Sequence, residues 1–274
     1  MATRIWHQSY LDLAQLPGYA AMLAEHGGSV CGSDTIVDLH GVETGDWPPG
    51  EYVKYSGQGN HLKVAQIVEN AIRAEREGYD AVALSVFLDP GLEDARSLLN
   101  IPVVSALETA LEVASKLGRS FALITRAKWM NPRVAALVRQ YRYDDRVAAL
   151  TSLDFPMRLD ELDAVCAAPG EFIDRFVRQA SALIRSGVDV IIPAEGLLNT
   201  VLVRSGVREI EGVPVLDSYG ALLAHAEMLV RIRRCSGSTT TPDGVPEQVA
   251  DQLRSATAAM LLRPHGAARV VGRA

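Results

Sequence analysis

The sequence predicts an α/β protein made of two similar lobes, each with a parallel sheet covered by helices. Short apolar runs alternate with amphipathic segments over most of the chain, which is typical of parallel strands joined by right-handed helical crossovers. A block of features also recurs at an offset of 109 residues, from Gly78 to Gly187. In each copy an amphipathic helix ends at the glycine, and a buried strand, an X-Pro-Val strand and a helix follow. We interpret this repeat as an internal duplication.

In the first half, the apolar pattern predicts strands at residues 4–10, 33–42, 80–87 and 101–105. Helices are expected at residues 11–26, with Pro17-Gly18 as a candidate break in the first turn, at 61–77, from the turn at Asp89-Pro-Gly91 through Leu98, and at 106–117. The run at 80–87 is apolar throughout, as expected for a strand buried on both faces. Residues 43–60 contain Pro48-Pro49 and four glycines, and we expect a loop there, long enough to be functional.

The second half follows the same order. Strands are expected at residues 120–125, 147–153, 188–192 and 213–217, and helices at 132–141, 171–185 and 219–233. The whole pattern predicts two pseudo-symmetric, Rossmann- or flavodoxin-like lobes with the site in the cleft between them. We assign residues 1–106 and 214–235 to the first lobe, 107–213 to the second, and 236–274 to a linker and a C-terminal helical tail.

The composition limits the classes of partner. A net charge of −6 argues against nucleic-acid binding, and the basic cluster at 231–234 is interpreted as a solvated helix end. No signal peptide is visible, and no apolar run approaches the roughly 20 residues that span a membrane. Cys31, Cys166 and Cys235 lie far apart without metal-type spacing, which fits a reducing compartment. We expect a cytoplasmic protein with a small-molecule substrate.

The chemistry should lie beyond the carboxyl ends of the strands, where open parallel sheets bind ligands. The loops that meet this condition begin at His7-Gln8-Ser9, Val86, Thr125 and Ala194, with residues 217–219 as a further candidate. Helix N-termini after these loops direct N–H groups at an anion, which implies a small carboxylate or a cyclic amide carbonyl. The chain has no Walker-type loop and no G-x-G-x-x-G motif, so nucleotide binding is disfavoured.

Glu195 is the first candidate for catalysis. It ends an apolar strand, where partial desolvation would bring its pKa toward the range of a general base. The alternative is that Glu195 only caps the following helix or pairs with a nearby arginine. Asn199 and Gly196 follow on the same loop.

The remaining candidates have competing structural explanations. His7, Gln8 and Ser9 could orient a substrate, or Ser9 could only cap the next helix. Thr125 and Lys128 could donate to an anion, although Lys128 could equally be a solvated charge. Asp89 is interpreted as a turn residue, and Ser85 is expected to face the core. The other histidines, at positions 26, 40, 61, 225 and 265, show no ligand spacing, so no metal site is predicted.

Four segments together resemble the aspartate/glutamate/hydantoin racemase superfamily, on its hydantoin racemase-like branch. They are Arg-Ala-Glu-Arg-Glu-Gly-Tyr-Asp-Ala-Val at 73–82, Phe-Leu-Asp-Pro-Gly-Leu at 87–92, Ile-Pro-Val-Val at 101–104, and 188–196. The resemblance covers residues 3–234 and implies a cofactor-independent site between two similar lobes. Racemases of this superfamily carry one cysteine in each half-site. The matching positions here are Val86 and Glu195, so racemisation by two thiols is not available to this chain.

The superfamily is also similar to one-base relatives, the arylmalonate decarboxylases and maleate isomerases. By that analogy, the backbone amides near Val86, Phe87, Leu88 and Gly196 and the Thr125 hydroxyl would hold an anion. The leading hypothesis is a cofactor-independent isomerase or lyase in which Glu195 is the only acid/base. The alternatives are a hydrolase in which Glu195 activates water, and a non-catalytic small-molecule binding protein. The resemblance and the extra tail favour a homo-oligomer.

Overall fold

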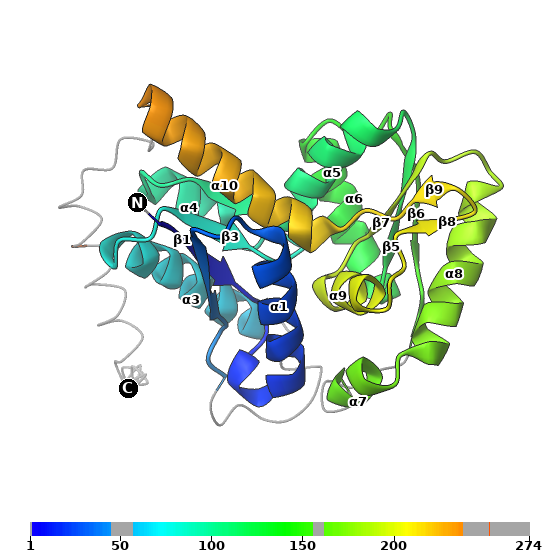
Figure 1. Cartoon of the computed structure of the whole chain (residues 1–274), viewed down its shortest axis with the longest axis horizontal. Coiled ribbons are helices and arrows are strands. Elements are labelled where there is room, and N and C mark those ends of the chain that lie inside the picture. Colours follow the sequence, from blue (N-terminus) through cyan, green and yellow to red (C-terminus); the bar gives the residue numbers. More distant parts are fainter. Residues whose placement is uncertain (1, 45–56, 156–161, 238–251, 253–274) are drawn as a thin grey trace, which may run out of the picture.

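Two parallel sheets lie side by side in the computed structural model, which describes residues 2–44, 57–155, 162–237 and 252 (Figure 1). The first sheet has the order β2-β1-β3-β4, and all of its neighbouring strands are parallel. Its strands are β1 (Thr3–Gln8), β2 (Thr35–His40), β3 (Ala81–Leu84) and β4 (Val103–Ser105).

The second sheet repeats this arrangement. It contains β5 (Phe121–Thr125), β6 (Val147–Ser152) and β7 (Val190–Pro193) in the parallel order β6-β5-β7. Val215 forms a parallel bridge with Ile191, so its segment lies beside β7 as β4 lies beside β3. The expected strand at 213–217 is otherwise reduced to β9 (Val213–Pro214), which pairs antiparallel with β8 (Glu209–Ile210). The shared strand order confirms the predicted fold class of two pseudo-symmetric α/β lobes.

Helices cover both sheets, and most of them lie where the sequence predicts. Pro17 does not break the first helix but begins it, because a proline at the first helical position loses no hydrogen bond. The long helix after the 43–60 region begins at Gly57 rather than at His61, and α7 was not expected. The helices are η1 (Leu13–Gln15), α1 (Pro17–Val30), α3 (Gly57–Arg76), α4 (Leu92–Leu98), α5 (Ala106–Leu117), η2 (Lys128–Met130), α6 (Asn131–Gln140), α7 (Leu162–Ala167), α8 (Gly170–Ile184), α9 (Gly196–Arg204) and α10 (Ser218–Ser236).

The two lobes share a core. One apolar cluster joins residues of the first sheet, such as Ile5 and Ala83, to residues of the second, such as Phe121 and Ile191. A second cluster, which includes Trp6 and Val82, lies on the other face of the first sheet. Figure 1 shows α10 (orange) returning from the second sheet to cross the first, and α10 contacts α1, α5 and strands β1, β3 and β4.

The predicted lobe boundaries stay a prediction, although the strands fall within the expected segments. Strands β1 to β4 lie within residues 1–106, β5 to β8 lie within 107–213, and α10 packs on the first sheet. The predicted tail at 236–274 lies almost wholly outside the described residues.

Two glycines with left-handed backbone allow a test of how tightly the first lobe packs. Gly91 has φ +71°, and a Cβ there would lie 2.8 Å from Cγ2 of Val68, whereas Gly78 has φ +76° and open space around it. We expect Gly78→Ala to lower the free energy of unfolding by about 1 kcal/mol through backbone strain alone. Gly91→Ala adds a steric clash and should cost about 2–4 kcal/mol. Urea denaturation measures both variants, and equal losses would contradict the clash.

Candidate active site

One small cavity lies where the carboxyl ends of four strands from both sheets meet. Its volume is about 70 Å³. The strand ends are those of β1, β3, β5 and β7, and α1 contributes one side chain. The lining residues are Ser9, Tyr10 and Leu11 after β1, Ser85, Val86, Phe87 and Leu88 after β3, Arg126, Trp129 and Met130 after β5, Glu195 and Gly196 after β7, and Tyr19 from α1.

The two half-sites predicted from the repeat face each other across this cavity. A Cβ placed on Gly196 would lie 3.8 Å from the Ser85 carbonyl oxygen and 4.0 Å from Ser85 Oγ. The same Cβ would lie only 2.9 Å from the Tyr19 hydroxyl, so a side chain at position 196 would displace that phenol. Gly196 therefore leaves room for the Tyr19 hydroxyl, whereas its distances to Ser85 are ordinary van der Waals contacts. Val86 and Glu195 both line this cavity.

Glu195 makes both of the structural contacts that were the alternatives to catalysis. It is the N-cap of α9, and its Oε2 accepts a hydrogen bond of 2.9 Å from the Leu198 N–H. Its Oε1 lies 3.8 Å from Nε of Arg126. The carboxylate nevertheless lines the cavity, with its side chain 19% exposed. These contacts fix the carboxylate in position without removing it from the ligand side of the sheet.

Arg126 is the charged residue of the site that sequence reasoning missed. Its side chain is 9% exposed and lines the cavity next to Glu195. Sequence reasoning pointed to the loop from Thr125 to Lys128 and left Lys128 as either an anion donor or a solvated charge. Lys128 instead begins η2 and its backbone N–H donates to Asp154 Oδ1, while its side chain does not line the cavity. A loop sequence does not show which of its consecutive residues turns inward.

His7 and Gln8 lie in the core rather than in the cavity, because β1 continues through Gln8. Both are fully buried. Gln8 Oε1 accepts hydrogen bonds from Trp6 Nε1 and Asn70 Nδ2, at 3.0 and 3.1 Å. Burial, with a smaller contribution from the charge of His40, lowers the pKa of His7 to about 3. Of the three residues expected at this strand end, only Ser9 lines the cavity, and its Oγ accepts from the Leu11 N–H at 3.0 Å.

Thr125 and Asn199 also lie outside the cavity lining. The side chain of each forms hydrogen bonds that connect neighbouring elements. The Thr125 hydroxyl donates to Asn131 Oδ1 at 2.6 Å, at the start of α6, which removes it from the expected anion site. The Asn199 side chain donates to Asp217 Oδ1 at 3.0 Å and accepts from the Ser218 and Tyr219 backbone, so it ties α9 to the start of α10. The other predicted residues, Val86, Phe87, Leu88, Glu195 and Gly196, do line the cavity.

Ser85, Tyr19 and Trp129 are further lining residues that the sequence did not assign to the site. Ser85 was expected to face the core, but β3 ends at Leu84, so Ser85 lies one residue beyond the strand and reaches the cavity. Tyr19 comes from a helix rather than from a strand end, and no pattern identifies it. Burial, and then the charge of Glu195, raises the pKa of Tyr19 well above its usual range, so its phenol stays a hydrogen-bond donor. Trp129 is 43% exposed and stands at the mouth.

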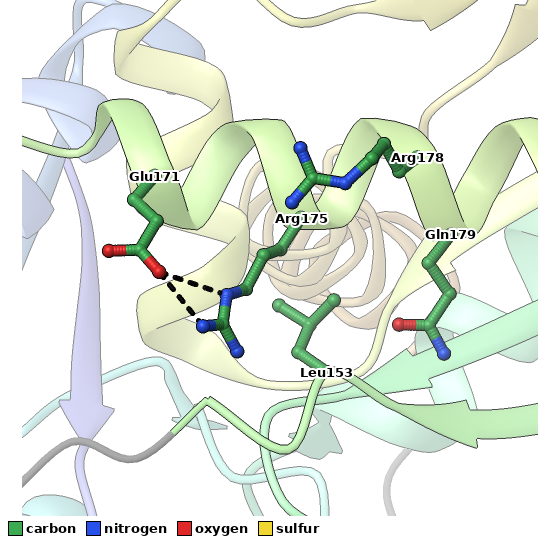
Figure 2. Close-up of a pocket in the computed structure, with 5 residues that line it drawn as sticks. All are labelled: Leu153, Glu171, Arg175, Arg178 and Gln179. Atoms are coloured by element: carbon green, nitrogen blue, oxygen red, sulfur yellow. Dashed lines mark hydrogen bonds and ion pairs between the residues drawn. The ribbon is translucent and has the colours of Figure 1, made fainter.

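A larger but shallower hollow lies elsewhere, on α8 near the end of β6. It measures about 480 Å³ and is lined by Leu153, Glu171, Arg175, Arg178 and Gln179. Figure 2 shows Glu171 and Arg175 paired along the helix, with distances of 3.2 and 2.8 Å to the guanidinium. Such an i, i+4 pair is a common feature of a solvated helix face. The hollow shares no residue with the cavity, and its carboxylate, Glu171, is exposed and paired with Arg175.

Other kinds of site find no support in the described part of the chain. No group of three or more His, Cys, Asp or Glu side chains could hold a metal ion there. None of the three cysteines lines the cavity. Among the helices that the structure describes, none has both the length and the apolar character to cross a membrane.

Comparisons with known proteins identify the family. A sequence model described as Asp/Glu/Hydantoin racemase matches residues 34–226, so the chain belongs to this family. A hydantoin racemase from Rhizobium meliloti is 25% identical over 181 residues, which are 64% of this chain and 70% of the relative. An allantoin racemase from Klebsiella pneumoniae has a similar fold, with a TM-score of 0.71 and 24% identity over 89% of this chain and 92% of that one. An unliganded arylmalonate decarboxylase has a TM-score of 0.53 and 20% identity over 84% and 93%.

Asp89, next to the lining residue Leu88, joins the two lobes. Its Oδ2 accepts a 2.7 Å hydrogen bond from the hydroxyl of Tyr141, which follows α6. Burial raises the pKa of Asp89 to about 7, and the charge of Glu108 adds to this, while the hydrogen bond from Tyr141 opposes it. The folded protein therefore keeps the proton on Asp89 over a pH range in which the unfolded chain has lost it.

This raised pKa predicts a pH-dependent stability. The contribution of Asp89 is fully present below about pH 4 and is lost as the pH rises to about 7, because only the unfolded chain ionises in that range. As the pH rises through this range, we expect the wild type to lose free energy of unfolding relative to Asp89→Asn, by at most about 4 kcal/mol. Asparagine tolerates the φ of +43° at this position. Parallel stability curves for the two proteins, measured by urea denaturation across this range, would contradict the prediction.

Proposed function

We propose that this chain is a cofactor-independent enzyme that transfers a proton at a carbon atom next to a carbonyl group, with Glu195 as the only acid/base. The observation that carries the proposal is the placement of Glu195. Its carboxylate lines the cavity at a strand end, held by Leu198 N–H and Arg126. The residue at the matching point of the other half-site is Val86, which lines the same cavity and cannot exchange a proton.

Family membership supports a small-molecule substrate and isomerase-type chemistry. The relatives are a hydantoin racemase and an allantoin racemase, so we infer a substrate that is a cyclic amide or a small carboxylate. A two-base racemase places an acid/base on each side of the reacting carbon. With one acid/base, the proton leaves and returns on one face of the substrate, which suits an isomerase that returns the proton to a different carbon atom, or a lyase in which the proton replaces a lost group. Homo-oligomer formation and a cytoplasmic location stay predictions.

The other residues of the cavity lining can stabilise the negative charge that such a reaction creates. Removal of a proton next to a carbonyl gives an enolate, whose negative oxygen needs hydrogen-bond donors. We infer that the backbone amides of the loop at 86–88 and of Gly196 provide them, together with the Ser9 and Ser85 hydroxyls. The tyrosine at position 19 adds a phenol that remains protonated. Thr125 is not included, because its hydroxyl is bonded to Asn131.

Glu195→Gln tests the proposal, because glutamine keeps an oxygen for the Leu198 N–H but cannot accept a proton. We expect turnover to fall by about 10²–10⁴-fold, while substrate affinity changes little. The substrates are a panel of 5-substituted hydantoins, allantoin and arylmalonates in D₂O, followed by NMR. Glu171→Gln, on an exposed pair with Arg175, is the matched control and should keep full activity.

The products identify the reaction class. Deuterium at carbon with the ring intact shows proton transfer at that carbon, and an isomerised, deuterated product indicates an isomerase. Loss of CO₂ with deuterium in the product indicates a lyase. Ring opening without carbon-bound deuterium would instead indicate a hydrolase in which Glu195 activates water. Binding without any turnover in either protein would show a non-catalytic binding protein and would contradict the proposal.

A further inference from the structure

We propose that Asp89 is a positioning residue of the proposed reaction. Its hydrogen bond with Tyr141 holds the 86–88 loop in the conformation that directs backbone N–H groups at the substrate oxyanion, and its carboxyl group must be uncharged for that oxyanion to form. The inference rests on the proposed function, since it assumes that this loop holds an enolate oxygen. It gives a role in the reaction to the Asp-Pro-Gly segment, which sequence reasoning interpreted only as a turn.

The turn at Asp89 is connected directly to the loop that lines the cavity. β3 ends at Leu84, and residues 85–88 all line the cavity. The Asp89 N–H then donates a 3.2 Å hydrogen bond back to the Val86 carbonyl oxygen. Asp89 adopts a left-handed backbone with φ +43° and is 5% exposed. The conformation of the loop and the position of the Asp89 side chain are therefore linked, and a shift of one moves the other.

The Asp89 side chain is fixed from the opposite lobe. Its Oδ2 accepts the 2.7 Å hydrogen bond from the Tyr141 hydroxyl. Tyr141 follows α6 of the second lobe, and its ring packs against both apolar clusters, as does Leu88 of the loop. The hydroxyl is thus held by the core and provides a fixed point to which the turn is attached. Loss of this bond would free the turn, and with it the backbone amides that precede it.

The surroundings of Asp89 favour an uncharged carboxyl group. Among the described residues, the titratable and charged groups that act on Asp89 or on its tyrosine partner are Tyr141 after α6, Glu108 on α5 and Arg96 on α4, whereas α3 presents apolar side chains to the turn. Arg96 is engaged with Glu108, with 3.2 Å between its Nη1 and Oε1 of the carboxylate. Because burial raises its pKa to about 7, Asp89 carries a proton in the folded protein below that pH.

A negative charge on Asp89 would oppose the reaction. Proton removal from the substrate places an anion at the backbone amides of residues 86–88. An ionised carboxylate one residue further along the chain would repel this anion in a region shielded from water. The reaction therefore needs a proton on Asp89 and none on Glu195, which must accept one. These opposite requirements predict a bell-shaped dependence of kcat/KM on pH, with Asp89 responsible for the fall at higher pH.

Tyr141→Phe tests the hydrogen bond, because it removes the hydroxyl and keeps the ring in the core. We expect kcat for deuterium exchange of 5-substituted hydantoins at pH 6 to fall by about 10–10²-fold, since small displacements at a reacting centre have effects of this size, while KM changes little. Tyr143→Phe is the matched control. It makes the same change two residues along the chain, where the ring packs near Phe121, and it should keep wild-type kcat.

Asp89→Asn tests the charge, because asparagine keeps an oxygen for the Tyr141 hydroxyl but cannot ionise. As the conservative replacement, it should retain most of the wild-type kcat at pH 6. Between pH 6 and pH 8 we expect kcat/KM of the wild type to fall by about 10-fold as Asp89 ionises, and that of Asp89→Asn to stay level. Both profiles are corrected for uncatalysed exchange and for the folded fraction, which circular dichroism measures.

Each outcome supports or overturns the inference. A loss of kcat in Tyr141→Phe together with a level pH profile for Asp89→Asn supports it. Wild-type kcat in Tyr141→Phe overturns it, and so does a change confined to KM. A wild-type kcat/KM that does not fall above pH 7, or one that falls equally in Asp89→Asn, also overturns it. Should Tyr141→Phe fail to fold, the two pH profiles decide the question.

The inference can fail separately from the proposed function. An inactive Glu195→Gln together with a fully active Tyr141→Phe overturns only the role of Asp89. An active Glu195→Gln, or a wild type that exchanges no deuterium with any substrate of the panel, overturns both.

Discussion

The close contact between the loops after β3 and β7 determines the geometry of the whole site. Each loop begins at the carboxyl end of a strand of its own sheet, so the contact depends on how the two sheets are packed. Gly196, which has no side chain, leaves the space that the Tyr19 hydroxyl occupies beside these loops. The result is a small cavity on which the ends of β1, β3, β5 and β7 converge. The residue types on those four loops then decide what the cavity can do.

The chemistry of the cavity is asymmetric although the fold is nearly symmetric. The half-site after β7 carries Glu195, and the loop after β5 carries its partner Arg126. The half-site after β3 presents Val86 and Phe87 together with one hydroxyl, on Ser85. Charge is thus concentrated on the second lobe, while the first lobe provides an apolar wall and neutral donors. Such an arrangement favours a reaction in which the proton moves on one side of the substrate.

The sequence was sufficient for the fold and for part of the site. Apolar periodicity and the repeat predicted two lobes with parallel sheets, and the strand-end rule selected Ser9, 86–88, Glu195 and Gly196, which line the cavity. The sequence pattern could not locate a strand end to within one or two residues. That error placed His7 and Gln8 in the site and left Ser85 out of it. Tyr19 is contributed by a helix, and its place in the site depends on tertiary packing. The same is true of Arg126, rather than Lys128, turning toward the cavity. A single sequence does not encode such packing locally.

The shared core has a consequence for how a duplicated protein can change. Because one apolar cluster runs through both sheets, the halves are expected to unfold together in one cooperative transition. A half that no longer contributes an acid/base therefore still carries part of the stability of the other half, and it cannot be discarded. It remains free to vary only at the few loop positions that face the ligand. Under the proposed function, a shared core thus lets one half serve as a scaffold and specificity wall while the other carries the reactive group.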